Sequence, residues 1–131
     1  MHFLFHHKKF FLVLFWLWVF VIIIFSIIPN VHTMKVEIDN TLYRTDYLIH
    51  FSVYFGMSVL FLLSRGKKIF KAKPITLIWF VIGGIFLAGL SEFVQAFIPG
   101  RTLNPIDLLF NVLGVISGLI SPRLLFRKPL Q

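Results

Sequence analysis

An uncharged run of nineteen residues, positions 10–28, constrains this chain more than any other feature of the sequence. About 20 apolar residues in a helix cross the hydrocarbon core of a bilayer. Of the 131 residues, 58% are hydrophobic and 14% are charged, and the mean hydropathy is +0.89. A soluble domain carries about 25% charged residues, and intrinsic disorder requires low hydrophobicity. Both classes are excluded, and we expect an integral membrane protein.

Three more apolar segments follow the first, which predicts an all-α bundle of four transmembrane helices in one domain, 1–131. Pro99 and Gly100 end the third segment. Asn104, Pro105 and Asp107 have the cap, first-position and first-turn residue types of a helix start. The expected helices are approximately 10–28, 47–63, 75–98 and 105–121.

The first segment could also be a secretory signal peptide, because Lys8 and Lys9 precede it. It is longer than a typical signal-peptide core, however, and the residues after it offer no small-residue cleavage pattern. We therefore expect a retained helix. The connection that follows, 29–45, is long enough to lie along the membrane surface or to form a short hairpin, and the sequence favours neither.

The Lys and Arg residues predict the orientation of the helices. Ten of the thirteen lie in the N-terminal segment, the loop after the second helix and the C-terminal tail, which share one side of a four-span protein. Because basic residues accumulate in cytoplasmic segments, both termini are expected in the cytoplasm of a cell whose plasma membrane holds the chain. The basic loop 65–73 is sufficiently explained as a topology signal and a contact for anionic lipids.

All five acidic residues fall in the outward half of this arrangement, and three of them lie in or at the ends of predicted helices. Ionisable groups in spans normally face a protein interior or a wet cavity. Asp46, His50 and Tyr54 are spaced four residues apart and share one helix face. An aspartate in a first turn is also favoured by the helix dipole alone, which is an equal alternative for Asp46 and for Asp107.

Asp107 is followed on its helix face by Asn111, Gly114 and Gly118. The glycines are expected to be positions where a neighbouring helix packs closely. Asn111 has two equally good interpretations, a hydrogen bond between helices and a contact with a ligand.

Glu92 is the acidic residue that helix geometry explains least well. It lies about two turns before the end of its predicted helix, where the dipole disfavours negative charge, and Gln95 is on the same side. We expect Arg101 or His50 as its partner, in a structural ion pair or a functional carboxyl group. Arg101, beside the next helix start, fits a phosphate or carboxylate site or a positive anchor at the head groups.

The sequence predicts no metal and no cofactor. There is no cysteine, and although His50, Asp46, Glu92 and Asp107 have acceptable ligand types, their spacing matches no zinc signature.

Three segments resemble motifs of the VanZ-like membrane proteins. Residues 46–54 resemble the D-K-x-x-H-F-x-x-Y segment of that family, with Tyr47 where a lysine is common; residues 91–102 resemble E-x-x-Q-x-x-x-P-G-R, and residues 107–114 resemble D-x-x-x-N-x-x-G. They occur in the family's order within 46–120. The resemblance implies a bacterial envelope protein related to teicoplanin resistance, and a proposed relation to membrane enzymes that act on lipid-linked phosphate head groups.

On this basis we expect a site at the outer leaflet. Its catalytic candidates are Glu92, His50, Asp107 and Asp46, and its substrate-binding candidates are Arg101, Gln95, Asn111 and Tyr54. The expected partners are membrane lipids, a lipid-linked phosphate or a glycopeptide, and not nucleic acid. The alternatives are a non-catalytic protein that binds a lipid head group, a glycopeptide or an envelope partner, and a small carrier or proton relay.

Overall fold

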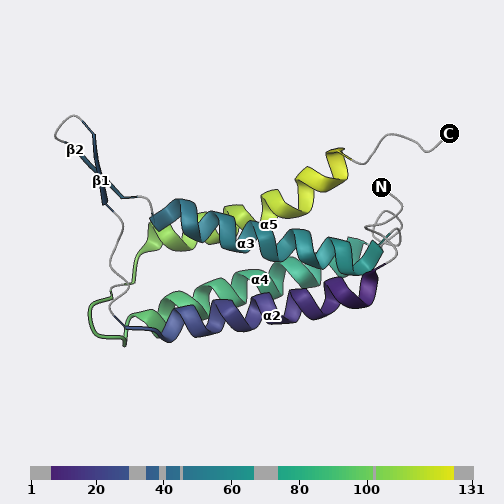
Figure 1. Ribbon diagram of the computed structural model, residues 1–131, viewed down its shortest axis with the longest axis horizontal. Coiled ribbons are helices and arrows are strands. Elements are labelled where there is room, and N and C mark those ends of the chain that lie inside the picture. The colour runs from purple at the N-terminus through teal and green to yellow at the C-terminus, as the bar shows by residue number, and fades with distance from the viewer. Residues whose placement is uncertain are drawn as a thin grey trace.

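The computed structural model describes residues 7–29, 35–38, 41–44, 46–66, 74–101 and 103–125. In these residues the elements are four helices and two strands, in the order α2 (Lys8–Ile27), β1 (Lys35–Ile38), β2 (Thr41–Arg44), α3 (Asp46–Arg65), α4 (Pro74–Gln95) and α5 (Pro105–Leu125). Successive helices run in opposite directions, so the start of α2 and the end of α5 lie at one end of the bundle (Figure 1). The other end holds the starts of α3 and α5, and we call it the hairpin end.

The connection between α2 and α3 contains a β-hairpin, one of the two possibilities left open by the sequence. Strands β1 and β2 pair antiparallel, with Lys35 opposite Arg44 and Ile38 opposite Thr41. In Figure 1 the hairpin projects from the bundle beside the start of α3. The bundle itself is all-helical as predicted, and the two-stranded hairpin is added to it.

Each of the four predicted helices overlaps a helix of the structure, and the bounds differ most at the ends of α4 and α5. The prediction extended α4 to residue 98, whereas it ends at Gln95. After Gln95 the backbone hydrogen bonds span three residues instead of four. The Phe97 N–H donates to the Val94 oxygen, and the Ile98 N–H donates to the Gln95 oxygen. These tighter turns, of the 3-10 type, end the α-helix before Pro99. Helix α5 continues through Pro122 to Leu125, beyond the expected 121.

Helices α3 and α5 make the most extensive contact in the bundle. Helix α2 packs against α3, helix α4 packs against α5, and α2 and α4 also contact each other. Glycine makes this close approach possible. A Cβ atom at Gly114 would overlap the backbone oxygen of Phe51, and one at Gly118 would lie 2.6 Å from the backbone oxygen of Phe55. The expectation that Gly114 and Gly118 are close-packing positions is therefore confirmed.

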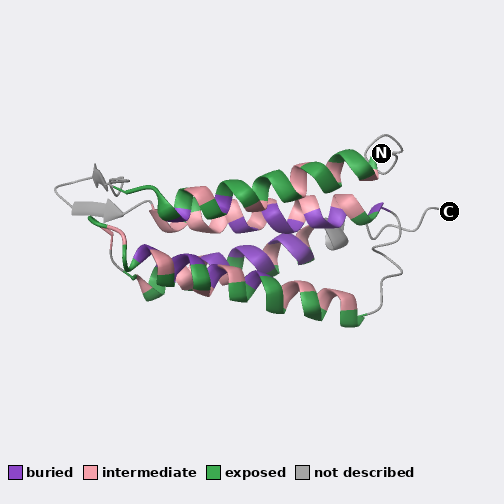
Figure 2. Ribbon diagram, turned by 90° about the horizontal axis from the view of Figure 1, so that it is seen from below, coloured by how far each residue is buried: buried purple, intermediate pink, exposed green. Residues whose placement is uncertain are grey.

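The distribution of polarity across the bundle is the reverse of that in a soluble protein. Most of its large apolar side chains are exposed, with Trp16, Trp79 and Phe86 each more than 60% exposed. Figure 2 shows exposed residues on the outward surfaces of the helices and buried residues where the helices face one another. The buried polar side chains are Ser26, Ser58, Ser91, Glu92, Gln95, Asp107 and Asn111.

This arrangement fits a surrounding of lipid. Helices α2, α3 and α4 are each long and apolar enough to cross a membrane, and α5 contributes a shorter apolar stretch, Pro105–Ser121. Because lipid tails are as apolar as leucine, helices in a membrane gain little from burying hydrophobic groups and associate through close packing and polar contacts.

Helix α2 is attached to the others by aromatic side chains. Away from the hairpin end, the ring of Phe15 packs against Phe61 of α3 and Phe80 of α4, which stack on each other with centroids 3.9 Å apart. Nearer the middle, Trp18 Nε1 donates a 2.9 Å hydrogen bond to the backbone oxygen of Val53. The aromatic contacts of α2 therefore lie mainly away from the hairpin end of the bundle.

We predict that Gly114→Ala destabilises the bundle by about 1–3 kcal/mol, because the added methyl group meets backbone that cannot move aside. Gly83→Ala and Gly89→Ala are matched controls, since nothing lies within 4 Å of a Cβ atom at either position. Alanine is the better helix former by about 1 kcal/mol, so the controls should be neutral or stabilising. Unfolding of purified protein in detergent measures all three, and equal stability of Gly114→Ala and wild type would contradict the close contact.

Candidate functional site

Four polar side chains from three helices meet at the hairpin end. His50 comes from α3, Glu92 from α4, and Asp107 and Asn111 from α5. His50 Nδ1 lies 3.5 Å from Glu92 Oε1, and His50 Nε2 lies 4.0 Å from Asp107 Oδ2. We call these four residues the acid–histidine cluster. The sequence predicted that they converge at one end of the helices, and the structure brings them together.

Asn111 connects the histidine to the buried carboxylate. Its Nδ2 donates a 3.2 Å hydrogen bond to Glu92 Oε1, and its Oδ1 lies 3.0 Å from His50 Nδ1. Glu92 is 1% exposed and Asn111 is 0% exposed, whereas the His50 side chain is 21% exposed. The imidazole is therefore the accessible member of this connected group.

The start of α5 holds Asp107 in place. Asn104 Oδ1 accepts a hydrogen bond from the Ile106 N–H, which makes Asn104 the helix cap that the sequence predicts. Asn104 Nδ2 donates a 2.9 Å bond to Asp107 Oδ2. The predicted helix-start role of Asp107 is confirmed, and the same carboxylate also faces His50. Because Asn104 and Asp107 already engage this helix start, its anion-binding capacity is partly used within the chain.

Further polar contacts continue along α3 below His50. The Tyr54 hydroxyl lies 3.0 Å from Ser91 Oγ, which itself donates to the Ala88 backbone oxygen. Tyr54 is therefore the donor in the first contact. One turn deeper, Ser58 Oγ donates a 3.0 Å bond to the Val115 oxygen of α5. Ser58 extends the four-residue spacing of His50 and Tyr54, and that spacing could have identified it from the sequence.

Arg101 is placed by a tight turn after α4. The Arg101 N–H bonds to the Ile98 oxygen at 3.1 Å, and Gly100 has a φ of 80°, as in a type II turn with Pro99 at its second position. Arg101 Nη2 then donates a 3.0 Å bond to the Phe25 backbone oxygen in the last turn of α2. A cation is favoured there because the final carbonyl groups of a helix lack intrahelical partners.

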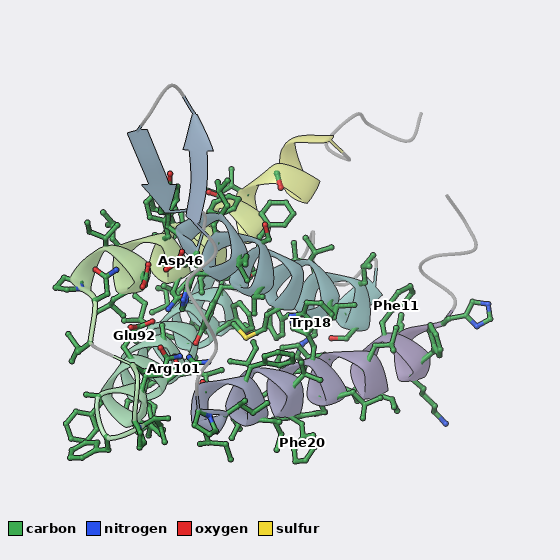
Figure 3. All side chains as sticks on the ribbon, turned by 60° about the vertical axis from the view of Figure 1, so that its left-hand side comes forward. Phe11, Trp18, Phe20, Asp46, Glu92 and Arg101 are labelled. Carbon is green, nitrogen blue, oxygen red and sulfur yellow. The ribbon has the colours of Figure 1, made fainter. Side chains whose placement is uncertain are left out.

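Arg101 and Glu92 influence each other without forming an ion pair within the described residues. Burial lowers the pKa of the Arg101 guanidinium, and the negative charge of Glu92 opposes that lowering. Figure 3 shows both side chains at the hairpin end, with Asp46 above them. Two buried atoms, Arg101 Nε and Glu92 Oε2, have no hydrogen-bond partner in the described part of the chain.

The remaining predicted site residues, Asp46 and Gln95, lie at the same end of the bundle. Asp46 begins α3 and is half-buried. Gln95 ends α4 and is buried. Sequence reasoning missed Ser91 as the partner of Tyr54, because that pairing depends on how α4 is rotated against α3.

In the residues described above, no group of three or more His, Cys, Asp or Glu side chains could hold a metal ion. The chemistry that these residues can supply is proton transfer by His50 and the carboxylates, and hydrogen-bond donation by Arg101.

Comparison with family models, curated proteins and solved structures found no match to this chain.

The contact between Tyr54 and Ser91 predicts two unequal mutational effects. Tyr54→Phe removes the donor and leaves Ser91 bonded to Ala88, so it should cost about 0.5–1.5 kcal/mol, as for an ordinary hydrogen bond. Ser91→Ala leaves the hydroxyl of Tyr54, a residue only 2% exposed, buried without its acceptor, which should cost more, about 1–3 kcal/mol. Unfolding in detergent compares the two, and a larger loss in Tyr54→Phe would show that the contact has been assigned in the wrong direction.

Proposed function

We propose that this chain is a four-span protein of the bacterial plasma membrane, with both termini in the cytoplasm and the hairpin end outside. The antiparallel order of the helices, their exposed apolar surfaces and the accumulation of Lys and Arg away from the hairpin end support this orientation. The shorter apolar stretch of α5 is accommodated by tilt or by local thinning of the bilayer.

At its outward end, the protein acts on the phosphate-bearing head group of a membrane lipid or a lipid-linked carrier. The observation that carries this proposal is the position of His50, whose partly exposed imidazole lies between the buried Glu92–Asn111 pair and Asp107. In the proposed orientation this imidazole is at head-group depth. An accessible imidazole beside two carboxylates has the composition of a general acid–base site.

In hydrolysis of a phosphate ester, His50 Nε2 takes a proton from water while the water oxygen forms a bond to phosphorus. The ester P–O bond breaks, and the same proton passes from His50 to the departing oxygen. Asp107 stabilises the imidazolium formed in between. The partly exposed guanidinium of Arg101 donates to a phosphate oxygen.

The resemblance of residues 46–54, 91–102 and 107–114 to the VanZ-like motifs supports the same placement. Those segments supply His50, Glu92, Arg101, Asp107 and Asn111, all of which lie at the hairpin end. A role of this chain in susceptibility to glycopeptides such as teicoplanin follows from that resemblance and is part of the proposal.

The orientation is tested by single cysteines, which report without background because the chain has none. Leu103→Cys lies near the start of α5 and Arg65→Cys at the end of α3, and both residues are exposed. A membrane-impermeant maleimide should label Leu103→Cys in intact cells, and Arg65→Cys only after lysis. The opposite pattern would reverse the proposed topology.

The enzyme is tested by purifying the protein and measuring phosphate release from lipid phosphates in mixed micelles. His50→Gln and Glu92→Gln should each lower turnover about 100-fold or more, as removal of a general acid–base group does. Ser58→Ala is the matched control, because it removes a buried polar contact from the same helix pair outside the cluster. Undiminished turnover in both cluster variants would refute the assigned roles.

A second candidate is non-catalytic binding of a head group, and the charge of the site favours it. Among the helices and the turn after α4, Asp46, Glu92 and Asp107 lie at the same end as Arg101, so a ligand that carries an ammonium group beside its phosphate would match both signs. Selective retention of phosphatidylethanolamine over phosphatidylglycerol, without any product, would support binding alone.

A further inference from the structure

Asn111 makes the hydrogen bond between helices that was one of its two interpretations, and both of its polar atoms contact the cluster. Its side-chain nitrogen donates to Glu92 Oε1, and its oxygen contacts His50 Nδ1. The residue is 0% exposed. It therefore has no accessible surface for a ligand, and its function must act through the residues that it touches.

The two contacts of Asn111 determine which histidine nitrogen carries the proton. A carboxylate oxygen only accepts hydrogen bonds, so the atom of Asn111 that faces Glu92 Oε1 is its NH₂ group. The carbonyl oxygen must then face His50, and it also only accepts. The proton between them consequently belongs to His50 Nδ1. The reverse orientation of the amide would place two acceptors 3.2 Å apart.

We propose that Asn111 is a positioning residue that locks His50 in the tautomer protonated at Nδ1, so that Nε2 is the nitrogen left to exchange protons. The tautomer follows from these contacts with an ionised Glu92 carboxylate, while the role of Nε2 rests on the function proposed above. In a neutral imidazole the bond made by one nitrogen fixes the state of the other. Here Nε2 is the nitrogen that faces Asp107 at 4.0 Å, beyond a direct hydrogen bond.

The surrounding packing keeps Asn111 in register with His50. Gly114, one turn after Asn111, sits against the backbone of Phe51, one residue after His50. The bond from Ser58 to Val115 ties the same two helices further along. Helices held this closely cannot slide past each other, so the amide and the imidazole keep their separation.

The tautomer is measured directly by nitrogen NMR of protein labelled with ¹⁵N-histidine in detergent micelles, at a pH where the ring is neutral. The His50 signals among the five histidines are identified by their loss in His50→Gln. Wild type should show a protonated Nδ1 and an unprotonated Nε2, opposite to the tautomer that predominates for histidine in water. A protonated Nε2 with an unprotonated Nδ1 would overturn the proposal.

The role of Asn111 is tested in Asn111→Leu, which keeps a similar volume without polar atoms. We expect His50 to lose its fixed tautomer and to show the Nε2-protonated form. Asn111→Gln, which moves the amide by one methylene group, is the second variant and should show the same loss. In either variant, retention of the wild-type signals would show that Asn111 does not set the tautomer.

Ser58→Ala is the matched control, since it removes another buried link between α3 and α5 without touching His50. Its His50 signals should equal those of wild type, and an equal change in Ser58→Ala would reduce Asn111 to a packing role. The NMR readout does not depend on turnover. A fixed tautomer in a protein that releases no phosphate would refute the proposed enzyme and leave the positioning role of Asn111 intact.

Discussion

The burial of the Glu92 carboxylate is the constraint on which the hairpin end of this bundle depends. A buried charge costs several kcal/mol unless nearby groups compensate it, and the apolar outer surfaces offer it no partner. Compensation comes from Asn111 of α5 and His50 of α3, which lie within 3.5 Å of Glu92 Oε1. Three helices must therefore meet at one level, and that meeting point fixes their relative positions along the bundle axis.

One face of α3 organises these contacts. His50 and Ser58 reach α5, and Tyr54 between them reaches α4. The two links to α5 need the backbones to approach closely, which Gly114 and Gly118 permit. Small residues thus set the distance between α3 and α5 while polar residues set their register, which is the division of roles expected where hydrophobic burial cannot drive association.

Features determined locally were predictable from the sequence. The helix positions follow from apolar length, the start of α5 from its Asn-Pro-x-Asp residues, and the shared face of His50 and Tyr54 from the helical repeat. Convergence of the cluster followed because its residues lie at the same ends of three helices. The Tyr54–Ser91 and Arg101–Phe25 contacts could not be predicted, since they depend on the rotation of α4 and the placement of α2. The early end of α4 reflects local turns that hydropathy does not reveal.

The contact between Arg101 and α2 bears on how well this end of the bundle is prepared for a ligand. An arginine free in solvent loses rotamer freedom when it binds a phosphate, but the Arg101 guanidinium is already held by the Phe25 oxygen. His50 is likewise held by Asn111 before any ligand arrives. A ligand that meets the Arg101 guanidinium and His50 Nε2 therefore encounters side chains that are already ordered by folding. Such preordered groups contribute most to binding and to stabilising a transition state.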